Sequence, residues 1–313
     1  MWVLGQCVTI LGLIVNALNI VVFVRQGLQD SVNISLLGLS ISDFGSLFFL
    51  LLVNLFWTPI IMQMDLSFYP SQIAYVFIWT HIVFTRVSTG ITAWITFERC
   101  LCIVAPLKIK SIITPRRTMA CIAVIYVIMI ASIAPVFYGV RAVWKFDTLR
   151  NKSVVVIVKI PESVQIERGT FWINNILPTI FLIFIITCAI VLVKALNRTA
   201  KWRETSTSLH NREDNLKQVG KLVLIISIVF IACYSPGTIV FMFVLIFPDF
   251  GYTRKQKNLL VAVFSFIFQL GAINATINFF VYLTVSSKFK RTFEQLFCVY
   301  CSKRKPNCAK EKT

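Results

Sequence analysis

The stretch ITFERCLCIVAP, from Ile95 to Pro106, interrupts a long apolar run with a glutamate and an arginine. The run begins near residue 71. A charged pair in so apolar a helix is costly unless it lies at the edge of whatever buries the helix. Pro106 follows shortly, and proline cannot continue a helix without losing a backbone hydrogen bond. The stretch therefore predicts a buried helix over 71–104 whose last turns reach water.

Outward from this stretch, the chain has the composition of a multi-spanning membrane protein. Of its 313 residues 57% are hydrophobic and 14% charged, and the mean hydropathy is +0.79. Crossing the hydrocarbon layer takes about 20 apolar residues. Seven blocks reach that length, over residues 3–24, 34–57, 71–104, 118–140, 171–196, 219–247 and 257–285. No alternating strand pattern is present, so no strand is expected.

The predicted fold is therefore an all-α membrane protein. We expect a bundle of seven transmembrane helices over residues 1–286, followed over 287–313 by a short amphipathic eighth helix and a basic cytoplasmic tail. None of the residue groupings typical of catalysis is present, so we expect neither an enzyme nor a metal centre.

The distribution of charge predicts the orientation. If the chain starts outside, 21 of its 31 Lys and Arg lie on the cytoplasmic side and nine on the opposite side. Because cytoplasmic loops are rich in Lys and Arg, we expect a multi-pass plasma-membrane protein with its start extracellular and its tail cytoplasmic. The net charge of +18 then favours contact with anionic lipids of the inner leaflet. No recognition helix accompanies the basic residues, so no nucleic acid partner is expected.

The other blocks carry motifs that form a consistent series with Glu98-Arg99-Cys100. In chain order these are Asn16 in VNALNIVVF, Asp43 in LLGLSISDF, Pro178, Phe230 and Pro236 in FIACYSP, and Asn278 and Tyr282 in NATINFFVY. Taken together and in this order, the motifs closely resemble those of rhodopsin-like (class A) G-protein-coupled receptors, over nearly the whole chain. Stretches such as DSVNISLL are most similar to the mostly orphan chemosensory receptors of molluscs.

The chain departs from the family pattern at several places. Tyr234 replaces the usual Trp of helix six, and Phe279 replaces the helix-seven Pro. Ala74 stands where the family has the Cys that ties helix three to the second extracellular loop, and this loop, 141–170, contains no Cys. Leu216 stands where some relatives carry an acid that locks Arg99. The resemblance therefore leaves the geometry of the extracellular lid open and predicts elevated basal activity.

The resemblance implies a receptor that transmits an extracellular ligand, by the narrower likeness a chemosensory small molecule, to a heterotrimeric G protein. The residues implied in coupling and activation are Glu98, Arg99, Asn278, Tyr282, Phe230, Pro178, Tyr234 and Pro236. Asp43 would form an ion or water network with Asn16, Ser88, Asn274 and Asn278. Oxygen ligands around a carboxylate suit Na⁺, the single cofactor considered; the alternative is a neutral Asp43 in a packing network.

A ligand pocket is expected on the extracellular side of this network. Its predicted residues are His81, Thr85, Arg86, Asn174, Tyr234, Thr238 and Phe268. Arg86 lies 13 residues before Arg99, about 20 Å deeper at ~1.5 Å per residue. Arg86 either anchors an anionic group of the ligand or is satisfied by carbonyls and neighbours such as Asn174. His81 stands where amine receptors place an Asp, which argues against an aminergic ligand.

Two modifications and three rival functions remain open. Asn151-Lys-Ser is a glycosylation sequon in an extracellular loop. Cys298 and Cys301 lie beside basic tail residues, where palmitoylation is plausible; free cytosolic thiols are the alternative. The rival functions are a peptide-type receptor of the same family, a transporter or channel, and a receptor that no longer signals.

Overall fold

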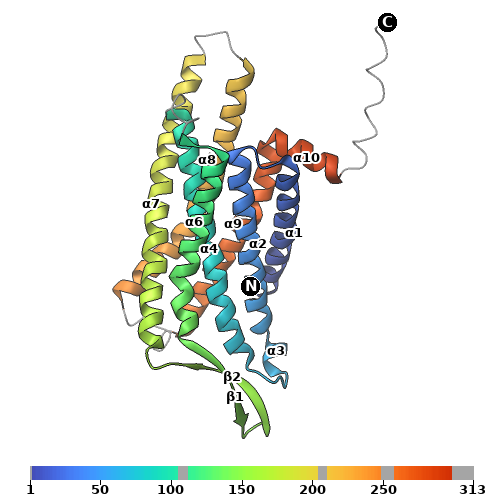
Figure 1. The fold of residues 1–313 in the computed structure, drawn as a ribbon, viewed down its shortest axis with the longest axis vertical. Coiled ribbons are helices and arrows are strands. Elements are labelled where there is room, and N and C mark those ends of the chain that lie inside the picture. The colour runs from blue at the N-terminus through green and yellow to red at the C-terminus, as the bar shows by residue number, and fades with distance from the viewer. Residues whose placement is uncertain (1, 105–111, 204–209, 248–256, 298–313) are drawn as a thin grey trace.

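The computed structural model describes residues 2–104, 112–203, 210–247 and 257–297. Seven long helices run side by side as one bundle (Figure 1). They are α1 Trp2–Gln26, α2 Ser31–Phe56, α4 Pro70–Val104, α6 Pro115–Tyr138, α7 Ser163–Arg203, α8 His210–Ile246 and α9 Lys257–Val285. Each of the seven predicted apolar blocks falls on one of these helices. The predicted fold class, a seven-helix membrane bundle, is confirmed.

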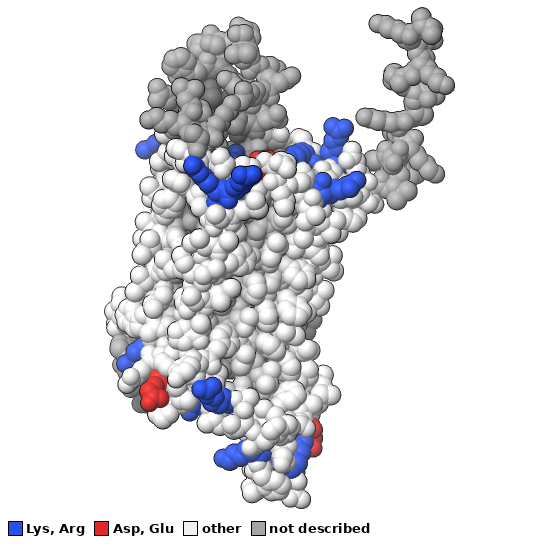
Figure 2. Space-filling model, in the orientation of Figure 1, with Lys and Arg blue, Asp and Glu red and all other residues white. Residues whose placement is uncertain are grey.

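Short elements mark the two ends of the bundle. The helix α3, Pro59–Gln63, and the strands β1, Val140–Asp147, and β2, Lys152–Lys159, lie at one end, and α10, Ser287–Phe297, lies at the other (Figure 1). We call these the hairpin end and the α10 end. Figure 2 shows that Lys and Arg gather at both ends and that the belt between them is almost free of charge on this face.

The helix α4 is the exception to the apolar pattern. Six of the described helices are long and apolar enough to cross a membrane, and α4 is not among them. It carries Arg86, Glu98 and Arg99 as well as a series of threonines. However, α4 packs against α2, α6, α7 and α8, so other helices surround much of its surface. A helix in this position needs less apolar surface than one that faces lipid.

The hairpin of β1 and β2 corrects the expectation that the chain has no strand. The strands pair antiparallel from Val140 opposite Lys159 to Asp147 opposite Lys152. The sequence of β2, KSVVVIVK, is a continuous β-branched run, so a search for alternation passes over it although its strand propensity is high. The predicted glycosylation site Asn151 is exposed in the turn with a φ of 51°, a conformation that asparagine tolerates better than most residues. Its glycosylation stays a prediction.

Non-covalent contacts attach the hairpin to the bundle. The backbone N–H of Val155 donates to the Ser67 carbonyl at 2.8 Å, and that of Ile157 donates to Gln72 Oε1 at 2.7 Å. The Tyr69 hydroxyl donates to Asp147 Oδ2 at 2.6 Å. Ala74 is fully buried in the slot where the family has its cysteine. In the described part of the chain, these hydrogen bonds and the ion pairs of Lys152 with Asp65 and of Lys159 with Glu167 attach the hairpin. They act at the place where the family has its disulfide and where the sequence predicts none.

Aromatic residues anchor α10 to the bundle. Phe289 is buried, and its ring centroid lies 5.2 Å from that of Phe23 on α1 and 5.5 Å from that of Tyr282 on α9. Phe279, at the position of the family proline, lies 5.6 Å from Phe293 of α10. Aromatic pairs at such distances stabilise beyond the area they bury. Phe279, which stands in place of the family proline, therefore contributes to the docking of α10.

Candidate functional site

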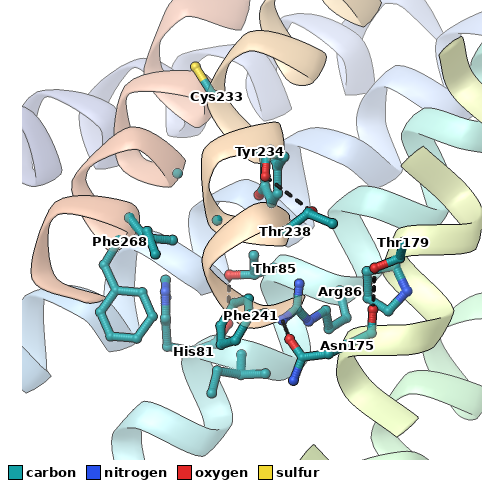
Figure 3. A pocket seen from close by; sticks show the side chains of 15 residues that line it. His81, Thr85, Arg86, Asn175, Thr179, Cys233, Tyr234, Thr238, Phe241 and Phe268 are labelled. Carbon is teal, nitrogen blue, oxygen red and sulfur yellow. Dashed lines mark hydrogen bonds between the residues drawn. The ribbon is translucent and has the colours of Figure 1, made fainter. Parts of the chain in front are cut away.

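A small cavity lies between α4, α7, α8 and α9, on the hairpin side of the middle of the bundle. Its volume is about 50 Å³. Six of the seven predicted pocket residues line it, namely His81, Thr85, Arg86, Tyr234, Thr238 and Phe268 (Figure 3). Pro178, predicted as part of the activation connector, also lines the cavity.

The seventh predicted pocket residue, Asn174, is not among the residues that line this cavity. Its amide Nδ2 donates to the Thr170 carbonyl at 3.0 Å, and its Oδ1 accepts from Ser132 Oγ on α6 at 3.2 Å. The neighbouring Asn175 lines the cavity instead. Both asparagines lie within one helical turn of Pro178, so spacing alone does not distinguish them. The phase of α7 against α4 decides which one faces the cavity.

Arg86 is held in the cavity by weak contacts. Its Nη2 lies 3.5 Å from Asn175 Oδ1, at the outer limit of a hydrogen bond. The guanidinium carbon lies 5.8 Å from the ring centroid of Phe241. The Nε atom is buried without a hydrogen-bond partner, and Arg86 enters no ion pair with any residue that the structure describes. A partly buried cation with so few partners is costly to the fold.

His81 both lines the cavity and bonds a neighbouring helix. Its Nδ1 lies 2.9 Å from the Ser46 carbonyl on α2. Because a carbonyl accepts only, Nδ1 carries the proton in this bond. The ring meets Phe268 edge-on at 5.1 Å. His81 is therefore fixed against α2, and the sequence does not reveal its partner Ser46.

At the α10 end of α4, Glu98 and Arg99 form the pair that the opening stretch predicts. Arg99 Nη2 lies 3.8 Å from Glu98 Oε1, and Ser35 Oγ donates to Glu98 Oε2 at 3.3 Å. Both side chains are buried, at 0% and 7% exposure for Glu98 and Arg99. The pair is thus more enclosed than a helix end in water. Glu98 gives Arg99 a countercharge, whereas Arg86 has none among the described residues.

Asp43 lies in the middle of the bundle and receives two side-chain hydrogen bonds. Ser88 Oγ donates to its Oδ1, and Asn278 Nδ2 donates to its Oδ2 at 2.9 Å. Asn16 instead donates to the Gly12 and Ala275 carbonyls at 2.9 Å. Of the four predicted companions, Ser88 and Asn278 therefore contact Asp43 directly.

The oxygens near Asp43 have the chemistry of a hard-cation site. Asn274 and Asn278 each keep a buried Oδ1 with no hydrogen-bond partner. Together with the carboxylate and the Ser88 hydroxyl, these are the ligand types that Na⁺ prefers. The residues present thus fit the expected ion. Bound there, the cation would offset the buried negative charge.

The helix α8 connects the cavity to the α10 end. Tyr234 of the cavity stacks on Phe230 with ring centroids 4.2 Å apart. Further along α8, Ser227 Oγ and Thr96 Oγ1 of α4 are 2.9 Å apart. Near the α10 end, Gln218 Nε2 donates to the Val285 carbonyl at 2.6 Å and to Ser287 Oγ at 2.7 Å. Sequence reasoning missed this last contact, since no motif marks Gln218. Pro236 lies within the stretch of α8 that lines the cavity, between Tyr234 and Gly237, and removes one backbone bond of α8.

Two predicted sites cannot be placed. Cys298 and Cys301 lie outside the residues that the structure describes, and their palmitoylation stays a prediction.

Comparison with known proteins gives the family. The family model described as 7 transmembrane receptor (rhodopsin family) matches residues 15–282. The pyroglutamylated RF-amide peptide receptor of Mus musculus is 24% identical, over 95% of this chain and 69% of its own. Galanin receptor 2b of Danio rerio is 24% identical, over 97% and 76%. The allatostatin-A receptor of Bombyx mori is 22% identical, over 93% and 77%.

The matched residues run from α1 to the end of α9 and include the Glu98–Arg99 pair, Asp43 and the cavity. The chain belongs to the rhodopsin family of seven-transmembrane receptors, and it is a class A G-protein-coupled receptor.

Proposed function

We propose that this protein is a receptor for an extracellular peptide, which binds above and into the cavity and activates a heterotrimeric G protein at the α10 end. The peptide class is supported by the relatives, whose names give RF-amide, galanin and allatostatin-A peptides as their ligands. This replaces the chemosensory small molecule as the preferred ligand, because no relative reported above is a chemosensory receptor.

The observation that carries the proposal is the path along α8. One helix contributes Tyr234 and Thr238 to the cavity and Gln218 to the contact with α9 and α10. A ligand that packs better against a tilted α8 shifts the population toward that state. Tilting α8 breaks the Gln218 contact and opens the α10 end, where Arg99 then meets the G protein.

The proposed orientation puts the hairpin end outside and the α10 end in the cytoplasm of a plasma-membrane receptor. Lys288, Lys290 and Arg291 are exposed on α10 while Phe289 between them is buried. Basic side chains beside an apolar anchor favour contact with anionic lipids of the inner leaflet. In the proposed resting state Na⁺ lies at Asp43, held by Ser88 and an Asn274 or Asn278 oxygen.

The test is G-protein nucleotide exchange by the full chain in nanodiscs, with synthetic RF-amide, galanin and allatostatin-A peptides as probes. We expect at least one peptide to stimulate exchange, and Arg99→Ala to lower the stimulated rate at least about tenfold, as the loss of a charged contact of ~1.5 kcal/mol would. The control Arg141→Ala removes an exposed arginine at the hairpin end. Full exchange by Arg99→Ala, or no exchange under any condition, would contradict the proposal.

A further inference from the structure

The cavity leaves most of the hydrogen-bonding capacity of Arg86 unused. A guanidinium has five N–H donors. In the part of the chain that the structure describes, they meet one amide oxygen, Asn175 Oδ1 at 3.5 Å, and the face of Phe241. Figure 3 shows the Arg86 side chain among these two residues and Thr179. A buried Nε without a partner is uncommon in native proteins and calls for a physical reason.

The three threonine hydroxyls of the cavity are already engaged with their own helices. Thr85 Oγ1 donates to the His81 carbonyl, Thr179 Oγ1 to the Asn175 carbonyl and Thr238 Oγ1 to the Tyr234 carbonyl. None of the lining residues in the described part of the chain is acidic. The cavity thus holds one cation and no countercharge of its own.

Size limits what can supply that countercharge. The cavity of about 50 Å³ holds a group equivalent to only a few waters, at roughly 10–15 Å³ each. A planar carboxylate fits this space and matches the guanidinium fork with two parallel hydrogen bonds. A bulkier dianion is disfavoured because Arg86 is the one cation among the described lining residues.

We infer that the ligand of this receptor carries a carboxylate that enters the cavity and pairs with Arg86, while the remainder of the ligand lies toward the hairpin. The inference rests on the proposed function, since it takes the cavity as the ligand site. The carboxylate belongs to a peptide C-terminus, to an acidic side chain of a peptide, or to a small organic acid. Lys145 and Arg168 at the hairpin end enter no ion pair with described residues and attract such anions.

Thermal unfolding of the purified full chain in nanodiscs tests this with matched pairs of probes. The first pair is N-acetylphenylalanine and its amide, the second the peptide acetyl-Gly-Gly-Phe with a free or amidated C-terminus. The third is N-acetylglutamic acid amide and N-acetylglutamine amide. We expect the acid of at least one pair to raise Tm by about 2–4 °C more than its neutral partner. The pair that responds identifies the source of the carboxylate.

Variants assign the effect to Arg86. In Arg86→Gln the difference between acid and neutral probe disappears, whereas in Arg141→Gln, which removes a cation outside the cavity, it remains. An acid preference that persists in Arg86→Gln, or no acid preference in any pair, would overturn the inference.

A second pair of variants needs no ligand and tests the missing countercharge directly. Asn175→Asp places a carboxylate beside Arg86 and is expected to raise the Tm of the free receptor and to abolish the acid preference. Asn174→Asp is the matched control, because Asn174 faces Ser132 rather than the cavity; it should do neither. Equal effects of the two variants would overturn the inference.

Nucleotide exchange separates this inference from the proposed function. Acid-specific binding without G-protein activation under any condition removes the signalling role and keeps the carboxylate site. Activation by acid and amide forms of a peptide with equal potency removes the carboxylate inference and keeps the receptor.

Discussion

The helix α4 carries a buried arginine at its α10 end and a partly buried one in the cavity, and the two differ in what surrounds them. Arg99 lies 3.8 Å from Glu98, whose second oxygen accepts from Ser35. Arg86 has a long contact to Asn175 and the face of Phe241. Both charges cost free energy to remove from water, but among the residues that the structure describes a countercharge is supplied for one of them only.

The difference extends to the helices around each arginine. At the α10 end, Gln218 bonds α8 to α9 and α10, and an aromatic cluster around Phe289 docks α10. At the hairpin end a cavity remains, and polar contacts hold the hairpin over the bundle. A charge that the chain pairs with its own countercharge can serve as a lock, whereas a charge without one among the described residues is open to a ligand.

The largest effect is expected from a variant that removes the countercharge of Arg99 and so makes its surroundings resemble those of Arg86. Glu98→Gln removes the countercharge but keeps the shape, so the resting packing loses about 1.5 kcal/mol and basal nucleotide exchange rises about tenfold. The matched control Glu162→Gln changes an exposed acid at the hairpin end. Unchanged basal exchange in Glu98→Gln would show that the pair is no lock.

The next effect concerns Asp43, which in the proposed resting state binds Na⁺ from solution. Wild-type Tm should rise by about 2–4 °C as Na⁺ replaces choline at constant ionic strength, because an ion that binds the folded state at several times its Kd stabilises it by ~1 kcal/mol. In Asp43→Asn this rise should vanish, and stimulated exchange should fall at normal surface expression. A sodium response in Asp43→Asn equal to that of the wild type would refute the ion site.

A smaller effect tests the contact that the motifs do not mark. Gln218→Ala breaks two hydrogen bonds at a partly exposed helix end, and basal exchange should rise about threefold, equivalent to ~0.6 kcal/mol. Ser287→Ala removes one of the two acceptors and should give a smaller rise. If neither variant changes basal exchange, Gln218 does not replace the acid that some relatives carry at the position of Leu216. The wild type is then expected to have the high basal activity that the sequence predicts.

The sequence predicted the features that depend on apolar length and on motifs. The stretch around Glu98 and Arg99 fixed the third membrane helix, and the Asp43 motif identified a buried carboxylate that does contact Ser88 and Asn278. The rotation of each helix about its own axis was not predictable in the same way. Whether Asn174 or Asn175 faces the cavity depends on how α7 rotates against α4 and α6, and both satisfy the same spacing.

Other features were missed because their signal is weak or distant in sequence. The strand β2 has high strand propensity but no alternation in its sequence, since five β-branched residues follow one another from Val154 to Val158. The partners of the hairpin are distant in sequence. Tyr69 lies 78 residues before Asp147, and Gln72 lies 85 residues before Ile157. Contacts of that separation are set by helix packing, which a single sequence does not specify.

The smallest expected effect concerns the hydrogen bond between Tyr69 and Asp147 that holds the hairpin. The hydrogen bond from Tyr69 is the main reason why the pKa of Asp147 lies below its ordinary value of 3.8. A carboxyl whose pKa is depressed by folding stabilises the fold above its ordinary pKa, and this contribution is lost as pH falls through the depressed value. The hairpin should therefore loosen only in acid, below pH 3.8.

Tyr69→Phe removes that hydrogen bond and should make the hairpin less dependent on pH. We expect amides of residues 140–159 to exchange hydrogen roughly twofold faster than in the wild type at pH 6, with little further increase in acid once intrinsic rates are corrected. Tyr138→Phe, which alters an exposed tyrosine at the same end, is the control. Equal acid loosening in Tyr69→Phe and wild type would show that the hydrogen bond from Tyr69 is not the source of the pH dependence of the hairpin.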